Sequence, residues 1–408
     1  MNYKIITTFL IAASMGSAFA QTADVVSTTG GTKDVYYQLS SGNKVEAEGS
    51  SWHFAFTTLL VDASVLSNDI AGVEVYMVSE DVANWDKIDT TGKLNQRIYN
   101  SEKSWNNGAF SNLGGMHPDY GWGTYNQSTH NLNAKRVFVI KLPNGDYKRM
   151  IIDKMETTGN VAFRIADMDG SNVISKSFNK NTYKNRNFVH YNLNLDSFIE
   201  YEAESIKWEL CFTKYFSEVA PGAQYPVTGV KINRDIKIAQ RDNMMVTSND
   251  TSTITYGDNI TEIGADWKTY NMTANKYEIT QDRAYFLKLK NNDVWKVYFT
   301  DYTGGPTGSF SFTKQLLVGT GSAGQMDNNN VVVYPNPAND KITLLTDATT
   351  NNWTIKMIDV TGKTVFAKQG NTAGFIQNTI EVSNFNKGFY IVEFTDGQIV
   401  VRKKVQVQ

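Results

Sequence analysis

Two histidines carry the side chains best suited to bind a metal ion in this chain. His130 follows the phrase Trp122-x-x-Tyr125 and precedes an apolar stretch that we expect to be a strand. His117 lies in a long segment rich in glycine and asparagine, residues 104–123. Imidazole nitrogen is a common iron ligand. His130 is therefore the first candidate ligand and His117 the second. The alternatives are a histidine hydrogen-bonded within a turn and a merely exposed side chain.

A similar phrase later in the chain lacks a histidine. Trp267-x-x-Tyr270 is followed by Met272, with no histidine in the matching loop. Thioether sulfur also ligates iron, although an unbranched methionine can equally fill a gap in a core. If a single metal-containing ligand binds, the half of the chain around His130 is the better candidate.

Three further reactive side chains are expected to have structural roles. His53 should point away from its strand neighbour Trp52 and make a local hydrogen bond, whereas His190 should face solvent. Cys211 alternates with polar residues in an expected strand, which indicates a buried and unreactive thiol. It is the only cysteine in the chain, so no intramolecular disulfide is expected.

Enzymatic motifs are missing from the sequence. There is no G-x-S-x-G elbow, no H-E-x-x-H pair and no P-loop. Residues 167–172, "DMDGSN", resemble the start of a calcium-binding loop without its distal glutamate. Asp153 and Asp301 recur at matched positions in two halves of the chain, which favours a structural role. The sequence therefore predicts a protein that is not an enzyme.

A repeated phrase indicates how these side chains are positioned. Trp52 and Trp208 each begin a Trp-x-x-x-Phe-Thr motif, and each follows a tyrosine-containing alternating stretch, "VYYQL" or "VHYNL". Matched strands, polar turns and aromatic-Lys pairs follow in the same order. We interpret this order as a duplication, with copy one at residues 33–180 and copy two at residues 186–317.

Composition and turn spacing predict an all-β fold. Hydrophobic residues make up 41% of the 408 residues and aromatic residues 12%, which suits packed cores and strands. Short alternating stretches separated by Gly, Asn and Asp turns predict antiparallel strands, and helices should be few and short. We expect residues 318–330 to be a linker and residues 331–408 to form an immunoglobulin-like β-sandwich.

The ends of the chain predict export. Residues 1–20 have a basic start, a short apolar core and Ala18-Phe19-Ala20, which is typical of a cleaved signal peptide. No later apolar run is long enough for a transmembrane helix. The formal net charge of −2, with both signs interspersed, argues against nucleic acid as a partner.

The C-terminal segment resembles the C-terminal sorting domain of proteins exported by the type IX secretion system of Bacteroidetes. The matching stretches are "YPNPAND", "IDVTGKTVF", "KGFYIVEF" and the Lys403-Lys404 pair. The resemblance implies passage through the periplasm and across the outer membrane. It also implies contact with the type IX machinery and its sortase, and a secreted or surface-bound product.

The duplicated part resembles the HmuY-like haem-binding family, through "VYYQL", "WHFAF" and "RVFVIKLPNGDYKRMII" in copy one and their counterparts in copy two. The resemblance implies two tandem HmuY-like antiparallel β domains, with haem or a host haem protein as a partner. It places ligand-bearing loops in the neighbourhood of His130. From the residues themselves, His117 is a possible second ligand and Met272 a possible ligand in copy two. Trp122 and Tyr125 belong to an aromatic group that suits haem, a sugar ring or a small core.

These features together predict a secreted, non-enzymatic binding protein at the outer cell surface, with haem as the first candidate ligand. The alternative is a surface adhesion protein that binds a glycan or a peptide on the same scaffold.

Overall fold

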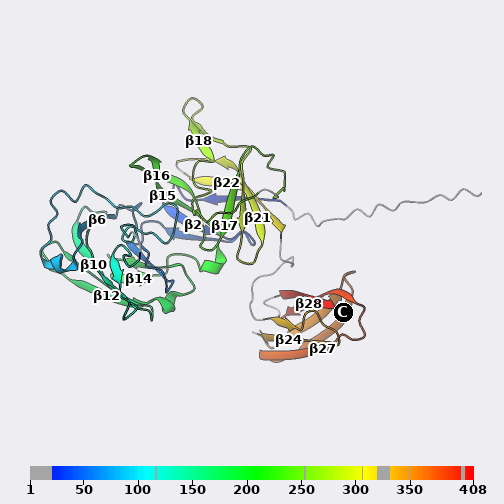
Figure 1. Ribbon diagram of the computed structural model, residues 1–408. Helices are drawn as coiled ribbons and strands as arrows, with labels where there is room; N and C mark the ends of the chain where they lie inside the picture. Colours follow the sequence, from blue (N-terminus) through cyan, green and yellow to red (C-terminus); the bar gives the residue numbers. More distant parts are fainter. Residues whose placement is uncertain are drawn as a thin grey trace, which may run out of the picture. The chain divides into compact units, whose positions relative to one another are not determined.

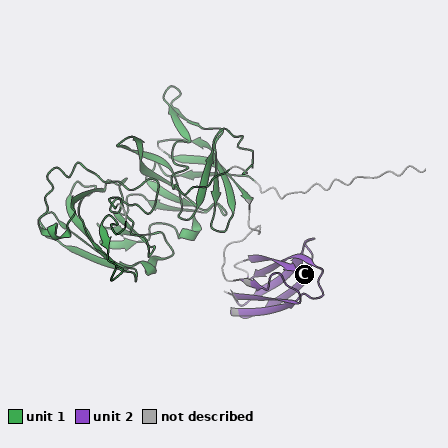
Figure 2. Cartoon of the chain, in the orientation of Figure 1, with its two compact units in different colours: residues 1–317 green, residues 318–408 purple. Residues whose placement is uncertain are grey.

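The computed structural model describes residues 21–114, 117–251, 254–305, 307–318, 331–348, 350–396 and 400–408. The described residues contain strands and three short 3-10 helices, so the prediction of an all-β chain is confirmed. The chain forms two compact units, residues 1–317 and 318–408 (Figure 2). The expected signal peptide and nearly all of the expected linker lie outside the described residues. The helices are η1 (Val82–Asp86), η2 (Lys180–Tyr183) and η3 (Ser205–Lys207).

The larger unit contains two β-sandwiches (Figure 1). The first sandwich is formed by β4 (Phe54–Thr57), β5 (Val65–Ser67), β6 (Glu74–Ser79), β7 (Gly123–Tyr125), β8 (Leu132–Ala134), β9 (Val137–Lys141), β10 (Tyr147–Met155), β11 (Asn160–Asp167), β12 (Ile174–Asn179), β13 (Phe188–Asn192) and β14 (Ser197–Ile199). One sheet has the order β14-β13-β4-β5, and the other runs β12-β11-β10-β9-β6, with the β7-β8 hairpin also joined to β10. Residues of both sheets share one hydrophobic core, to which Phe54, Phe163 and Tyr191 belong.

The second sandwich repeats this arrangement. It is formed by β1 (Thr22–Ser27), β2 (Lys33–Tyr37), β3 (Lys44–Glu48), β15 (Leu210–Ala220), β16 (Ala223–Ile232), β17 (Lys237–Arg241), β18 (Lys268–Asn271), β19 (Lys276–Ile279), β20 (Ala284–Lys288), β21 (Val294–Tyr302) and β22 (Ser309–Val318). Its sheets have the orders β3-β2-β15-β16 and β1-β22-β21-β20-β17, with β18-β19 as a separate hairpin. A second core joins the two larger sheets and includes Tyr37, Leu210 and Phe312. The equivalent strand orders support the interpretation of a duplication.

The two sandwiches exchange strands. In the second sandwich, Tyr37 on β2 pairs with Leu210 on β15; in the first, Tyr191 on β13 pairs with Phe54 on β4. Each central ladder therefore joins a strand from one sequence copy to a strand from the other. The first sandwich is continuous in sequence, from β4 to β14, whereas the second combines β1–β3 with β15–β22.

The chain crosses between the sandwiches twice, at residues 49–53 and 200–209. These crossing segments do not coincide with the boundary between the two sequence copies. The strands β13 and β14 belong to copy two but complete the core of the first sandwich. Gly49 allows a close approach at the first crossing: its amide donates to the carbonyl of Thr32, and a Cβ atom there would lie 2.8 Å from that oxygen. The two copies therefore keep the same alternation of buried and outward side chains, but β4 and β15 each pair with a strand of the other copy.

The smaller unit is a sandwich of its own, as predicted for residues 331–408. Its sheets have the orders β23-β24-β27 and β26-β25-β28-β29, and Ile342, Met357 and Phe394 belong to its shared core. The strands are β23 (Val332–Tyr334), β24 (Lys341–Ala348), β25 (Trp353–Asp359), β26 (Thr364–Gly370), β27 (Gly374–Glu381), β28 (Gly388–Thr395) and β29 (Val400–Val407).

Candidate ligand site between the two sandwiches

The first candidate ligand, His130, lies in the turn of the β7-β8 hairpin. Its backbone is left-handed, with φ 58°, and its Nδ1 atom is 2.6 Å from the hydroxyl oxygen of Tyr125. In the matching β18-β19 hairpin, Asn275 has φ 51° and accepts a hydrogen bond from the Tyr270 hydroxyl. His and Asn are among the residues that adopt this conformation most readily. The local structure therefore accounts for His130 as a hydrogen-bonded turn residue.

His117 lies close to the same hairpin. Its ring centroid is 5.0 Å from that of Tyr125 and 6.2 Å from that of Tyr120, and its side chain is exposed. Asp119 fixes this loop through an ion pair with the buried Arg136, with a closest distance of 2.7 Å. The hydrogen bond from Arg136 holds the pKa of the Asp119 carboxyl well below its usual range. The structure thus brings His117, Tyr125 and His130 together at the surface.

The other two predicted residues lie elsewhere. Trp122 is 1% exposed, belongs to the first core and donates a hydrogen bond from Nε1 to the Ala63 carbonyl. Met272 is 87% exposed in the β18-β19 turn, so it fills no gap in a core. Across the described residues, no group of three or more His, Cys, Asp or Glu side chains is arranged to hold a metal ion.

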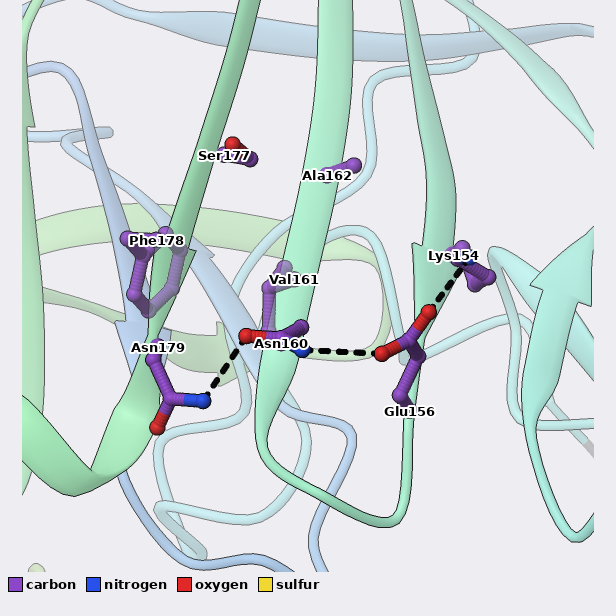
Figure 3. A pocket seen from close by; sticks show the side chains of 8 residues that line it. All are labelled: Lys154, Glu156, Asn160, Val161, Ala162, Ser177, Phe178 and Asn179. Atoms are coloured by element: carbon purple, nitrogen blue, oxygen red, sulfur yellow. Dashed lines mark hydrogen bonds and ion pairs between the residues drawn. The ribbon is translucent and has the colours of Figure 1, made fainter.

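A surface depression of about 390 Å³ lies along β10, β11 and β12 (Figure 3). Its polar side chains bond to one another. Lys154 forms an ion pair with Glu156 at 2.5 Å, and Asn160 donates to the same carboxylate at 2.9 Å. The hydrogen bond from Lys154 lowers the pKa of Glu156 to about 2. Since these groups already have partners, the depression offers few free polar atoms to a ligand.

A second cavity, of about 90 Å³, lies where the two sandwiches meet, and we call it the junction cavity. Both crossing segments contribute to it, through Trp52 and Tyr201. Strands of both sandwiches supply most of the rest of its lining, together with the loops that precede β2, follow β5 and follow β6. The side chains that line the cavity include Asp34, Tyr36, Trp52, Ser67, Asp69, Trp105, His190, Tyr201, Cys211, Thr213, Lys214, Tyr215 and Lys231.

The repeated tryptophans lie at equivalent places beside this cavity. Trp52 packs edge-on against His190 at 5.0 Å, and Trp208 packs edge-on against Tyr36 at 5.0 Å. Tyr36 and His190 are the second residues of "VYYQL" and "VHYNL", on the faces of β2 and β13 opposite the cores. Tyr201 contacts both, with centroid distances of 6.4 and 4.7 Å. The repeated motif therefore supplies the aromatic packing between the two sandwiches.

The prediction that His190 faces solvent is wrong. The side chain is 4% exposed, because the face of β13 that points away from the core is covered at the junction. Burial lowers the pKa of His190 to about 3, so the ring is neutral near pH 7. His53 behaves as predicted, since its Nδ1 accepts a hydrogen bond from the Leu193 amide at 3.1 Å. Cys211 is buried, as predicted, and burial raises the pKa of its thiol.

Two carboxylates and one amine with shifted pKa values lie at the junction cavity. Asp34 accepts hydrogen bonds from the hydroxyls of Tyr201 at 2.6 Å and Thr213 at 2.5 Å. Asp69 accepts one from the Asn100 amide at 2.9 Å. Burial raises the pKa of both carboxyls. Burial also lowers the pKa of Lys231, against the attraction of Asp69.

The Lys231 ammonium lies over aromatic rings. Nζ is 4.7 Å from the ring centroid of Tyr215 and 5.2 Å from that of Trp105. Trp105 comes from the first sandwich and donates a hydrogen bond to the Ile232 carbonyl of the second, at 2.9 Å. The cation and its aromatic partners thus span the junction.

Sequence reasoning missed the junction residues. Asp34, Asp69 and Lys231 lie far apart in the chain and belong to no motif. The one available signal was the matched position of Tyr36 and His190 in the two alternating stretches. A polar aromatic side chain at that position in both copies indicates a shared environment, but it does not identify the neighbours.

Comparison with known proteins identifies the C-terminal unit. Residues 332–408 match the family described as "Secretion system C-terminal sorting domain". No curated protein matches the chain. Among solved structures, the BSP domain of a biofilm-associated protein is similar at 8% identity and a TM-score of 0.16, over 100% of this chain and 84% of that one. A similarity this weak supports no argument about fold or function.

The described residues contain no helix long and apolar enough to cross a membrane. The sorting domain implies interaction with the secretion machinery. Residues 332–408 are a type IX secretion C-terminal sorting domain, and the protein is exported to the cell surface or beyond it.

Proposed function

We propose that the duplicated part is a non-enzymatic binding protein whose ligand enters the junction cavity. The observation that supports this proposal is the lining of that cavity, where aromatic rings and charged side chains from both sandwiches converge. Small-molecule sites typically combine apolar walls with a few placed polar groups, and they often lie between domains. The sorting domain presents this site outside the cell.

The test is binding by the purified mature chain to arrays of immobilised glycans and peptides, with variants at the cavity. Lys231→Met and Trp52→Leu should weaken any specific signal, because they remove a donor and an aromatic wall from the cavity. Lys268→Met is the matched control, since Lys268 lies over Trp267 and Tyr302 at 4.6 and 4.7 Å, away from the cavity lining. Signals that survive both cavity variants would contradict the proposal.

Haem is the second candidate ligand, on a different surface. The gathering of His117, Tyr125 and His130 favours it, together with the resemblance to the HmuY-like family. In this alternative the iron is held at the β7-β8 hairpin, because the junction cavity, at about 90 Å³, is too small for a porphyrin.

Hemin titration distinguishes the two candidates. Haem binding at the hairpin should shift the Soret band sharply at stoichiometric protein, and His130→Ala should weaken the shift. His53→Ala is a buried-histidine control that leaves the hairpin intact. An unshifted spectrum excludes haem as the natural ligand and leaves the junction cavity unaffected as a candidate.

A further inference from the structure

We infer that the junction cavity recognises an uncharged sugar, through hydroxyl groups at the end of a glycan. The inference rests on the proposed function, since it names the ligand class of the same cavity. It follows from three properties of the lining: its hydrogen-bonding groups, its charge balance and its size.

The lining offers both donors and acceptors to a ligand. Within the described part of the chain, the Lys231 ammonium contacts aromatic faces and donates no hydrogen bond. The Ser67 hydroxyl and His190 Nδ1 also lack a hydrogen-bond partner, but almost none of their surface is exposed, so they are not counted among the groups that face a ligand. Asp34 and Asp69 use only part of their acceptor capacity on protein donors, since a carboxylate has about four lone-pair sites. A hydroxyl both donates and accepts, so adjacent hydroxyls can bridge the ammonium and a carboxylate.

The charges of the lining balance. Its charged side chains are Asp34, Asp69, Lys214 and Lys231, two of each sign. An anionic ligand would meet two carboxylates, and a cationic ligand would meet two ammonium groups, at short range and partly shielded from water. A neutral ligand with polar groups avoids both penalties.

The aromatic walls and the small volume of the junction cavity narrow the class of ligand further. Trp52, Trp105 and Tyr201 provide ring surfaces against which the C–H face of a sugar can pack. The cavity has a volume of about 90 Å³, which is small for a ligand pocket. A space of this size suits the hydroxyl-bearing edge of one sugar ring, so we infer that the recognised group is at the end of a glycan.

The test compares neutral, anionic and cationic monosaccharides, using saturation-transfer NMR and calorimetry on the mature chain. The neutral probes are the methyl glycosides of glucose, galactose, mannose and N-acetylglucosamine. The anionic probe is methyl glucuronide and the cationic probe is methyl glucosaminide. At least one neutral glycoside should bind, and more tightly than both charged probes.

Variants assign the signal to the cavity. Lys231→Met should weaken binding roughly tenfold or more, as loss of a hydrogen bond from a charged group typically does. Trp52→Leu removes an aromatic wall of the cavity, so it should also weaken binding. Lys268→Met should leave the affinity unchanged.

The outcomes separate the inference from the proposed function. Binding of a charged probe in preference to every neutral one, with sensitivity to Lys231→Met, overturns the sugar assignment and supports a ligand site at the junction. If a neutral glycoside binds with the same affinity to the wild type, Lys231→Met and Trp52→Leu, the sugar binds elsewhere and the inference is overturned. If no probe binds, and if the signals on the glycan and peptide arrays are the same for the wild type and the cavity variants, both proposals fail.

Discussion

At the scale of single residues, the junction shows how position decides the chemistry of a side chain. His130 and His190 are both histidines near tyrosines, but His130 lies in an exposed turn and His190 is buried between two aromatic rings. Burial favours the neutral imidazole, because a charged ring would lose its hydration. The buried histidine therefore links the stability of the junction to pH.

Acid should destabilise the protein through His190. In the unfolded chain its pKa is about 6.5, whereas burial lowers the pKa to about 3 in the folded state. Between these values the unfolded state binds a proton that the folded state does not, so stability falls as the pH falls. From pH 6.5 to pH 5 the loss from this residue should be about 2 kcal/mol.

Urea unfolding of the wild type and His190→Gln at pH 7 and pH 5 measures this contribution. The variant should lose less free energy of unfolding on acidification, and the exposed variant His130→Gln should follow the wild type. Equal losses in all three proteins would show that His190 is charged or exposed in the folded state.

At the scale of the elements, the exchange of strands is the main property of the fold. β13 completes the first core through Val189 and Tyr191, although it belongs to the second sequence copy. A fragment cut at the sequence repeat therefore differs from a fragment cut at the crossing segments. The two fragments have similar lengths, which makes them a matched pair.

Residues 52–204 should fold alone, and residues 33–180 should not. The first fragment keeps β4 to β14 and the whole first core. The second lacks β13, which leaves β4 unpaired on one side, and carries β2 and β3 without their partner β15. Thermal unfolding and the dispersion of amide NMR signals distinguish the two outcomes. A cooperative transition for residues 33–180 would mean that each copy can close on its own strands.

The sequence was sufficient to predict the all-β class and the sorting domain, but not the exchange. "VYYQL" and "VHYNL" have the same alternation of core-facing and outward-facing side chains. The sequence pattern is therefore compatible with pairing of either strand to β4 or to β15. The connections and the packing at Trp52 and Trp208 decide between them, and these depend on the whole fold. His190 was assigned to solvent for the same reason, since a strand pattern does not show that a second sandwich covers its outer face.

The candidate site was predictable only in part. The surface group of His117, Tyr125 and His130 follows from residues close together in sequence. The junction cavity depends on contacts such as that of Asp34 with Thr213, which are far apart in sequence and join the two copies. Local patterns contain no information about such contacts.

At the scale of the whole molecule, a unit of two sandwiches is joined to a sorting domain. The sorting domain has its own hydrophobic core, and each sandwich has a large core of its own. Export and folding should therefore be separable by truncation.

Deletion of residues 332–408 should retain the protein in the periplasm while leaving the two sandwiches of residues 21–317 folded. Cell fractionation and accessibility to external protease locate the product, and circular dichroism of the purified truncated chain checks its folding. A reporter that carries residues 332–408 should reach the cell surface. Surface display of the truncated chain would mean that export does not depend on this domain.

The two crossing segments have a consequence for the resistance of the exported protein to proteolysis. A single proteolytic cut within residues 49–53 leaves the two sandwiches covalently joined through residues 200–209. The severed N-terminal piece remains held by the β1-β22 and β2-β15 ladders. The two sandwiches separate only after a second cut, because the chain connects them twice. In a protein whose two domains are joined by a single linker, one cut would be enough to separate them.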